Sequence, residues 1–394
     1  MVTAFAQEGL LEYFYTTVAG FEDTAWLQYL VRDIGRRAFK THLKPFTVTH
    51  PWREICRQLA NRTGIYKLTK EENSVFSIDA VYRSLDRYVS KRISKAAGRA
   101  RLIYAYEDGS FYSFAAAKKT GLACVYDLPI AYWKTALKLL MEEAERLPEW
   151  KNTLRRSINN SPEKLERKTA EMEMADLVIA PSRFVADSVL KEFSGKKILV
   201  SPFGTPLFSE EIKRADLKRN DRLRVLFAGS LGQRKGLADL AKAIQVLNNR
   251  GVELVVMGSR LEKESFYKKH LPAYTYIRPA PHCGALKVMS SCHVLCLPSI
   301  VEGRALVMQE AMSRGLPIII TKNTGGEDLV KEGETGFVVP VRSPEMIAEK
   351  INWFAEHRKF IADMGLAAAS HARAYSWEVY GETIIHAIHA MPLI

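Results

Sequence analysis

In the second half of the chain, short apolar runs alternate with amphipathic segments. The apolar runs end at glycine, proline or a polar residue and are predicted to be strands over 222–230, 253–257, 293–297, 317–321 and 336–340. The segments between them carry apolar residues at helical spacing, over 237–247, 305–314 and 327–332. Strands that are apolar throughout and alternate with helices are typical of a parallel sheet covered on both faces. This half is therefore predicted to be a doubly wound α/β domain.

The first half follows a similar but less regular pattern. A helix over 2–11 precedes predicted strands over 12–18, 101–106, 122–126 and 176–180, with long helices over 80–98 and 133–147. A Pro- and Gly-containing segment at 201–206, followed by the charged segment 208–222, marks the break between domains. After 342 the chain is predicted to be helical over 343–357, 358–374 and 376–390. We therefore expect domains over 1–202 and 203–375 and a C-terminal helix within 376–394.

Composition narrows the class of protein. The chain has 394 residues, 47% hydrophobic and 26% charged, which is ordinary for a globular protein of two domains. Five cysteines are too few for a disulfide scaffold in a chain of this length, and a reducing cytoplasm is the expected compartment. No apolar run approaches the roughly 18 residues that a membrane-spanning helix needs, and the N-terminus lacks the basic region of a signal peptide.

The charge is strongly positive, with 57 Lys and Arg against 44 Asp and Glu. Such an excess favours an anionic partner. Within 80–99 the cations repeat every four residues beside an apolar face, at Arg83, Arg87, Lys91, Lys95 and Arg99 and at Leu85, Val89, Ile93 and Ala96. This helix either lies on an anionic membrane surface at the inner face of the membrane or docks as an ordinary surface helix on its own sheet. No recognised nucleic-acid motif accompanies the charge, so nucleic acid is not expected as a partner.

Two strand–helix loops carry the chemistry. The loop 229–236 reads Gly-Ser-Leu-Gly-Gln-Arg-Lys-Gly, which places Gly232, Arg234 and Lys235 where backbone N–H groups and the helix dipole face an anion. Two full positive charges at that point suit a diphosphate. A solvated basic turn is the alternative, because the loop is neither a P-loop nor a dinucleotide-binding fingerprint.

The second loop follows the strand over 293–297. Glu302 comes after the strand, Gly303 permits a tight turn, and Glu310 lies eight residues further on the predicted helix. The N–H groups of Arg304, Ala305 and Leu306 open that helix and can bind a phosphate oxygen. One carboxylate can then bind hydroxyls at the phosphate end of a ligand. The second carboxylate can bind hydroxyls further along the same ligand. The alternative makes Glu302 a helix cap and Glu310 a surface residue.

Together these loops resemble those of family 4 glycosyltransferases, which have the GT-B fold. The matching elements include the Glu-x7-Glu motif at Glu302 and Glu310 and the Pro-Ser pair ending at Ser299, together with segments 227–236, 311–319, 324–326, 334–340, 175–182 and 201–204. The resemblance is strong over about 165–345 and weaker upstream. It implies an α/β fold of two Rossmann-like domains facing each other across a cleft, with the last helix crossing back to the first domain.

The resemblance also implies a function in glycan biosynthesis. The expected reaction moves a sugar from a nucleoside-diphosphate sugar to a glycan or lipid-linked acceptor, with retention of configuration. Arg234 and Lys235 would hold the diphosphate, Glu302 the donor sugar, the N–H groups of 304–306 the distal phosphate, and Glu310 the ribose. The base is expected near 276–282. The chain contains no Asp-x-Asp, which favours a metal-independent transferase without a cofactor.

Several positions depart from the family pattern. Ser230 stands where many members have Arg, and 126–129 stands where many have a His on the acceptor side. The acceptor-side candidates are Asp127, which is alternatively a helix cap, and Glu107 and Asp108 after the preceding strand. The family's first domain opens with a strand and a Gly-rich loop, whereas this sequence starts almost directly in a helix. A non-catalytic sugar-nucleotide-binding or partner subunit with a degenerate first domain is therefore the alternative function.

Two further expectations follow from the C-terminal half. The pairs His282–Cys283 and Cys292–His293 and the nearby Cys296 match no zinc spacing, so we predict core residues there and no metal site. In 376–390 the apolar residues recur at helical spacing, and Trp377 is expected near the domain junction with the helix packed on residues before 200.

Overall fold

The second half of the chain forms a six-stranded parallel sheet. Its strand order is β11-β10-β9-β12-β13-β14, so the sheet grows outward in both directions from the pair β9 and β12. In doubly wound sheets, ligands bind beyond the carboxyl ends of the strands at the point where the order reverses. The strands are β9 (Leu223–Ala228), β10 (Val252–Met257), β11 (Tyr274–Ile277), β12 (Val294–Leu297), β13 (Ile318–Thr321) and β14 (Gly336–Val339).

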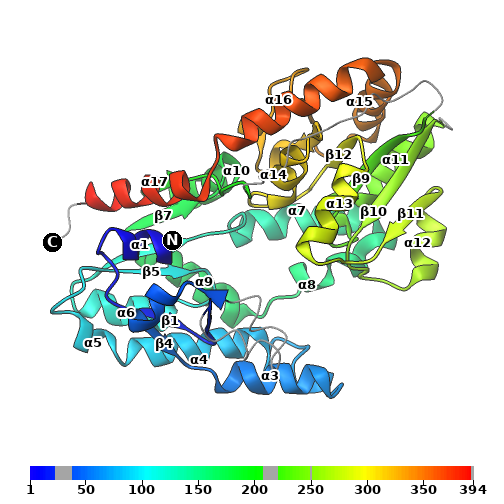
Figure 1. Ribbon diagram of the computed structural model, residues 1–394. Coiled ribbons are helices and arrows are strands. Elements are labelled where there is room, and N and C mark those ends of the chain that lie inside the picture. The colour runs from blue at the N-terminus through cyan, green and yellow to red at the C-terminus, as the bar shows by residue number, and fades with distance from the viewer. Residues whose placement is uncertain (23–37, 207–220, 249–250, 392–394) are drawn as a thin grey trace.

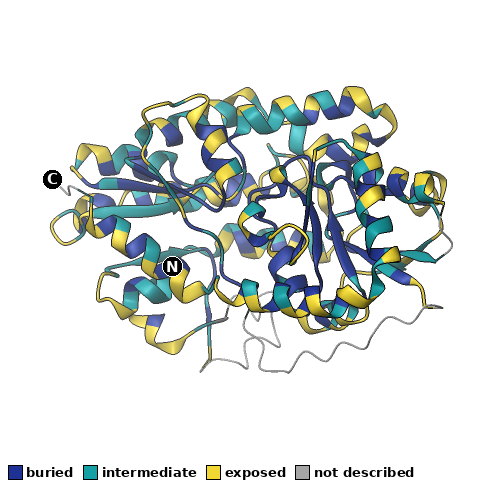
Figure 2. Cartoon of the chain, turned by 90° about the horizontal axis from the view of Figure 1, so that it is seen from above, coloured by how far each residue is buried: buried dark blue, intermediate teal, exposed yellow. Residues whose placement is uncertain are grey.

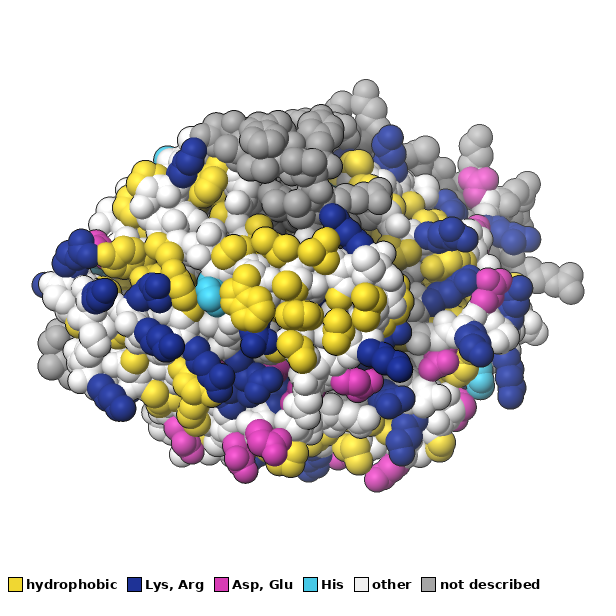
Figure 3. Space-filling view, turned by 90° about the horizontal axis from the view of Figure 1, so that it is seen from below, with side chains coloured by type: hydrophobic (Ala, Val, Ile, Leu, Met, Phe, Trp, Pro, Cys, Tyr) yellow, Lys and Arg dark blue, Asp and Glu magenta, His cyan; other side chains and the backbone are white. Residues whose placement is uncertain are grey.

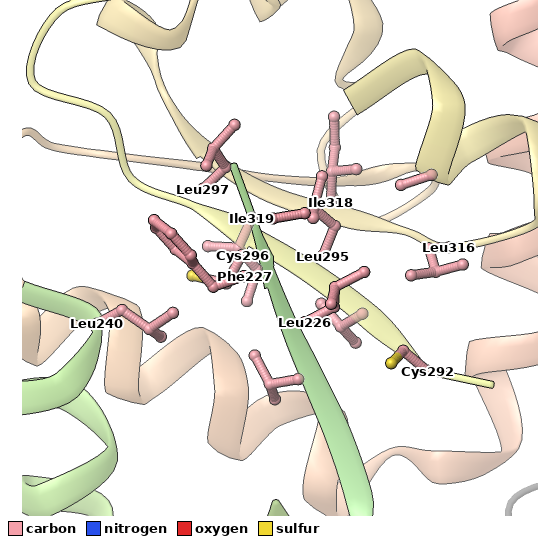
Figure 4. Packing of buried hydrophobic residues seen from close by; sticks show 14 of the residues in the cluster. Leu226, Phe227, Leu240, Cys292, Leu295, Cys296, Leu297, Leu316, Ile318 and Ile319 are labelled. Atoms are coloured by element: carbon pink, nitrogen blue, oxygen red, sulfur yellow. The ribbon is translucent and has the colours of Figure 1, made fainter. Parts of the chain in front are cut away.

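Burial on both faces explains the apolar composition of these strands. Side chains of β9, β12 and β13, such as Leu226, Phe227, Leu295, Cys296 and Ile319, are completely buried and meet in one core (Figure 4). Helices lie on both sides of the sheet (Figure 2), with α11 in contact with α15 and α14 with α16. The helices of this half are α11 (Leu237–Leu247), α12 (Glu264–His270), α13 (His282–Ser290), α14 (Leu306–Ser313), α15 (Pro344–Glu356) and α16 (Ile361–Arg373).

The first half is built on a smaller parallel sheet, and the computed structural model shows it facing the second across the molecule (Figure 1). Residues 1–22, 38–206, 221–248 and 251–391 are described. The four strands lie in sequential order, namely β5 (Leu102–Tyr106), β6 (Ala123–Asp127), β7 (Leu177–Ala180) and β8 (Ile198–Val200). The helices of this half are α1 (Val2–Gln7), α3 (Trp52–Arg62), α4 (Ile78–Ser90), α5 (Ile93–Ala96), α6 (Phe111–Lys119), α7 (Trp133–Arg146), α8 (Arg155–Ile158), α9 (Pro162–Met174) and α10 (Arg183–Leu190).

Short elements complete the described chain. Two small parallel sheets pair β1 (Phe14–Thr16) with β4 (Thr47–Thr49) and β2 (Gly20–Phe21) with β3 (Ala38–Phe39). The 3₁₀ helices are η3 (Thr41–Phe46), η4 (Tyr66–Leu68), η5 (Pro148–Leu154), η6 (Gln233–Lys235), η7 (Lys322–Thr324), η8 (Glu327–Leu329) and η9 (Arg358–Phe360). None of the described helices combines the length and the apolarity needed to cross a bilayer.

Several predicted elements differ from those observed. The strand expected over 12–18 is only β1, and it pairs with β4 instead of joining the main sheet. The helix expected over 327–332 is one 3₁₀ turn, because Val330 already has an extended backbone. The segments that form β8, β11, α12 and α13 were not predicted. Most of the charged segment 208–222 lies outside the described residues.

The cationic helix predicted over 80–98 is also corrected. It is interrupted between α4 and α5, and its apolar side chains Val89 and Ile93 are buried in the core of the first domain. Arg83 pairs with Asp79 at 2.8 Å, and Arg99 pairs with Glu12 at 3.1 Å. The apolar stripe of this segment therefore docks on its own domain and is not available to lipid.

The last helix, α17 (Trp377–His389), crosses back to the first domain (Figure 1). Tyr380, Ile384, Ile385 and Ile388 pack in one cluster with Val125 of β6, Leu177 and Ile179 of β7, and Phe5 of α1. Trp377 lies at the junction, where its ring stacks on Phe203 with 6.0 Å between centroids. The crossover predicted from the apolar stripe is thus confirmed.

We expect Ile384→Ala to destabilise the first domain although the residue lies near the C-terminus. Ile384 is completely buried against that domain, and truncating such a side chain costs about 2–5 kcal/mol. Urea unfolding and hydrogen exchange of the amides in β6 and β7 test this. The exposed Val379 on the same helix supplies the control Val379→Ala. An equal effect of both substitutions would contradict the packing.

Candidate functional site

Two loops meet at the point where the strand order of the second sheet reverses. One follows β9 and contains the 3₁₀ turn η6, and the other follows β12. The N–H of Ile300 donates to the carbonyl of Arg234 at 2.9 Å. Gly236 has a φ of 76°, and a Cβ there would lie 2.0 Å from the carbonyl oxygen of Pro298. Only glycine permits this backbone conformation and approach, which hold the two loops together.

An ionic centre joins the two loops. Glu302 Oε1 lies 2.6 Å from Lys235 Nζ and 2.8 Å from Arg234 Nη1. Arg234 Nη1 also donates to the carbonyl of Val301 at 3.0 Å. The Glu302 and Lys235 side chains are each 12% exposed, and that of Arg234 is 24% exposed. The sequence motifs thus meet as two cations on one carboxylate, with a net positive charge that can receive an anion.

Burial and the neighbouring charges act in opposite directions on Glu302. Burial alone would raise its pKa, but Lys235 and Arg234 outweigh that effect and lower it. Burial lowers the pKa of Lys235, and the charge of Arg234 acts in the same direction, while Glu302 opposes both. Glu302 therefore offsets part of the effect of burial on Lys235, and the two cations more than offset the effect of burial on Glu302.

Gly303 is where the second domain touches the first. A Cβ on Gly303 would lie 1.8 Å from the carbonyl oxygen of Pro129, so no larger residue fits without movement of the backbone. The hydroxyl of Ser182, at the start of α10, donates to the carbonyl of Gly303 at 2.5 Å. The ionic centre is therefore directly beside the interface between the domains.

The other predicted donor-site residues lie around the same loop. α14 begins at Leu306, with Ala305 as its N-cap, and the N–H of Ala305 points to the carbonyl of Thr324 at 3.4 Å. The Oγ of Ser299 is buried and has no hydrogen-bond partner among the described residues. Glu310 is half-buried on α14, 3.6 Å from His282 at the start of α13. Gly232 lies close to Leu261 and Thr153, which a Cβ would meet at 2.7 and 3.3 Å.

Arg304 has a structural role that its sequence position did not suggest. Its guanidinium donates to Gln309 Oε1 at 2.9 Å and pairs with Asp328 at 2.7 Å. The side chain is completely buried inside the second domain. The side chain of Arg304 is therefore not available to a phosphate, although its backbone N–H is still a candidate.

The acceptor-side candidates are already engaged within the first domain. Asp127 is 1% exposed and accepts hydrogen bonds from Tyr104 at 2.5 Å and from Tyr380 of α17 at 3.2 Å. Glu107 pairs with Lys168 at 3.0 Å, and Asp108 lies 3.6 Å from the same lysine. Burial raises the pKa of Asp127 despite these hydrogen bonds. Asp127 thus neither caps the following helix nor faces open space, and it fastens α17 to β6.

Solved structures with the same architecture are glycosyltransferases of the GT-B fold. Sucrose-phosphate synthase from Thermosynechococcus elongatus superposes with a TM-score of 0.59 at 18% identity, covering 79% of each chain. The Anabaena protein HepE in complex with UDP and glucose superposes with a TM-score of 0.55 at 17% identity, covering 97% of this chain and 100% of that one. At these identities the likeness concerns the fold.

Related sequences are also glycosyltransferases. Residues 208–371 match the family model of the group 1 glycosyl transferases. A D-inositol 3-phosphate glycosyltransferase from Paenarthrobacter aurescens is 26% identical over 239 residues, which are 55% of this chain and 59% of that protein. The chain therefore has the GT-B fold, and its residues 208–371 are similar to the group 1 glycosyl transferases. The capsular polysaccharide biosynthesis glycosyltransferase CapM from Staphylococcus aureus is 31% identical over 141 residues, or 34% of this chain and 36% of CapM. The chain spans about half the length of the curated relatives it matches.

A buried polar network around Gln233 supports the cationic turn η6, and the local sequence pattern did not predict it. Gln233, immediately before Arg234, donates to Glu143 of α7 at 2.6 Å and to Asp239 at 2.7 Å. Its N–H donates to Thr153 of η5 at 3.1 Å. Glu143 also accepts from Arg342 at 2.8 Å. The only sequence signal was Gln233 inside the motif, because two of its partners, Thr153 and Glu143, lie 80 and 90 residues away in the chain.

The cysteines and histidines of the second domain differ in burial. Cys292 and Cys296 are completely buried, and all five cysteines are free thiols. His282 and Cys283 are both exposed at the start of α13, which corrects the prediction that they belong to the core. Among the residues that the structure describes, no cluster of three or more His, Cys, Asp or Glu side chains is arranged to hold a metal ion.

We expect Lys235→Met to raise the pKa of Glu302. The carboxylate would stay buried while losing the nearer of its two cations, so its charged form would lose stabilisation. Carboxyl NMR of labelled protein measures this pKa, and the Glu302→Gln variant assigns the resonance. A pKa unchanged by the substitution would show that the 2.6 Å contact does not control the charge of Glu302.

Proposed function

We propose that this protein is a metal-independent, retaining glycosyltransferase that moves a sugar from a nucleoside-diphosphate sugar to a glycan or lipid-linked acceptor. The observation that carries this proposal is the pairing of Lys235 and Arg234 with Glu302 at the reversal point of the second sheet. A doubly wound sheet binds its ligand at that edge, and the net positive charge of the centre suits a diphosphate.

Each group has a distinct role in the proposed donor complex. Arg234 and Lys235 hold the diphosphate, and the N–H groups of Arg304 and Leu306 bind its distal oxygens, because the N–H of Ala305 already donates to Thr324. Glu302 holds the donor sugar. Glu310, on the helix α14 that follows the same loop, binds the ribose. The base lies near 276–282, a segment that ends where His282 approaches Glu310 at 3.6 Å.

Electrostatics explains how these residues accelerate transfer. When the bond between the sugar and the diphosphate breaks, negative charge grows on the leaving diphosphate oxygen. Fixed cations and N–H donors stabilise that charge more in the transition state than in the ground state, and this difference lowers the barrier. The Arg234 and Lys235 side chains are held in place by Glu302 before the ligand arrives, so little reorganisation is needed.

Similarity to known glycosyltransferases supports sugar transfer as the class of reaction. The family model covers the half of the chain that contains Glu302, Lys235 and Arg234. A non-catalytic subunit with a degenerate first domain is not favoured, because relatives and neighbours carry the names of transferases and synthases that use this fold. Retention of configuration comes from the resemblance to family 4 and is tested by NMR of the anomeric proton of the first product.

We expect Glu302→Ala and Lys235→Ala each to reduce transfer at least about a hundredfold while the fold is retained. Each substitution removes one member of the ionic centre, and losing a transition-state contact of this kind costs about 3–4 kcal/mol. Release of nucleoside diphosphate from a panel of sugar nucleotides measures the loss. Glu349→Ala and Lys242→Ala, on exposed helix surfaces of the same domain, are the matched controls. Wild-type turnover in either site variant would refute the assignment.

We expect activity to persist in EDTA. The proposed clamp neutralises the diphosphate with Arg234 and Lys235, which is the task that a divalent ion performs in metal-dependent transferases. The measurement compares initial rates in EDTA, in manganese and in magnesium. Loss of activity in EDTA followed by recovery in either metal would contradict metal independence.

A further inference from the structure

The first domain exposes many large apolar side chains within one stretch of the chain, residues 52–82. On α3, Trp52, Ile55 and Leu59 are 46%, 46% and 52% exposed, and they share one helix face by their spacing. The chain that follows adds exposed apolar side chains in η4, before α4 and on α4, namely Ile65, Tyr66, Leu68, Val75, Ile78 and Tyr82. We call this set the α3 surface. Soluble domains rarely leave such a contiguous patch uncovered without an interaction partner.

Contacts tie the start of α3 to the segment over 68–76. The ring of Trp52 meets that of Phe76 edge-on, with 6.3 Å between centroids. Arg53 donates to the carbonyl of Val75 at 2.6 Å, and its guanidinium covers the Trp52 ring at 4.6 Å. The N–H of Phe76 donates to the carbonyl of Leu68 at 2.9 Å. The exposed side chains are therefore held in place by backbone and ring contacts beneath them.

Positive charge borders the α3 surface. Arg62, Lys67 and Lys70 are exposed within it, and Lys70 lies over the Tyr66 ring at 4.4 Å. Two of the acidic side chains in the same segment face inward, since Glu54 is 1% and Asp79 4% exposed. Figure 3 shows this underside of the molecule, where α3 and α4 lie in Figure 1, with apolar side chains gathered in a field and Lys and Arg side chains along part of its border.

We propose that the α3 surface docks on an anionic lipid bilayer. Apolar and aromatic side chains can enter the boundary between headgroups and acyl chains while the surrounding lysines and arginines pair with lipid phosphates. Tyr and Trp favour this boundary because their rings are apolar and their polar atoms stay hydrated. A second copy of the chain is a poorer occupant, because a two-fold interface would bring the same cations of both copies together.

This inference changes which part of the molecule meets the membrane. The cationic segment over 80–99 packs Leu85, Val89 and Ile93 into the core of its own domain, whereas α3 and η4 keep their apolar side chains outside. The inference also extends the proposed function, because a bilayer at the first domain would present a lipid-linked acceptor to the domain that does not bind the donor. Docking itself needs no sugar nucleotide and can be measured without one.

Co-sedimentation of the full chain with vesicles tests docking. We expect binding to vesicles of phosphatidylcholine mixed with phosphatidylglycerol, much weaker binding to phosphatidylcholine alone, and loss of binding as salt increases. Leu59→Glu should weaken binding at least about tenfold, because it places a charge where an apolar side chain would enter the bilayer. Leu366→Glu on α16 is the matched control, since Leu366 is 50% exposed and Leu59 52%. It should bind as the wild type does.

Charge is tested by a second pair of variants. Lys67→Glu should weaken binding by about fivefold or more, whereas Lys242→Glu on α11 should not. Circular dichroism confirms that each variant is folded, and nucleoside-diphosphate release in the absence of vesicles reports the donor site separately.

The proposal is overturned if the wild type does not bind the mixed vesicles, or if it binds both kinds of vesicle equally. Equal binding of Leu59→Glu and Leu366→Glu would also overturn it. A wild-type dimer that only Leu59→Glu converts to a monomer would assign the surface to a second copy instead. None of these outcomes depends on transfer activity, so a failure of docking and a failure of the proposed function are distinguishable.

Discussion

One buried carboxylate with two cations holds the functional region of this protein together. Glu302 is contacted by Lys235 and Arg234, which come from a different strand–helix loop. Separately, each of these side chains would lose the solvation of its charge without compensation. As a group they stay ionised, fix the geometry of both loops, and leave one net positive charge at the edge of the sheet where a ligand binds.

The same region is coupled to the first domain through backbone and buried polar contacts. Gly303 touches Pro129 and accepts from Ser182, immediately after the ionic centre. Gln233, immediately before it, is held by Glu143 and Thr153, which precede the domain junction in the chain. Hinge motion between the domains would therefore act on both sides of the donor site. Closure of this kind excludes water, which favours transfer over hydrolysis.

The sequence was sufficient for features that depend on local pattern. Largely apolar runs identified β9, β10, β12, β13 and β14, because strands buried on both faces leave few polar positions. The apolar stripe of α17 likewise required a partner outside the second domain, and it is packed on β6 and β7. The loop motifs placed Lys235, Arg234 and Glu302 correctly at strand ends, where the structure brings them together.

Features that depend on distant contacts could not be predicted from local pattern. Glu143 is one of several acidic residues on an amphipathic helix, and only the fold shows that it is buried against Gln233 and Arg342. The carboxylate of Asp127 accepts from two tyrosines, one of them 253 positions away. The break between α4 and α5 follows no proline or glycine, and β1 pairs with a strand that has no strong apolar run.

Calorimetric titration with a nucleoside diphosphate tests the central claim most directly, namely that this ionic centre is a diphosphate site. The wild type and Lys242→Met should bind with the same affinity, because Lys242 is an exposed lysine away from the loops. Lys235→Met should bind at least about tenfold more weakly and with a smaller dependence on salt, because a charge-assisted contact has been removed. Equal affinity of Lys235→Met and Lys242→Met, or no binding by the wild type, would contradict the account.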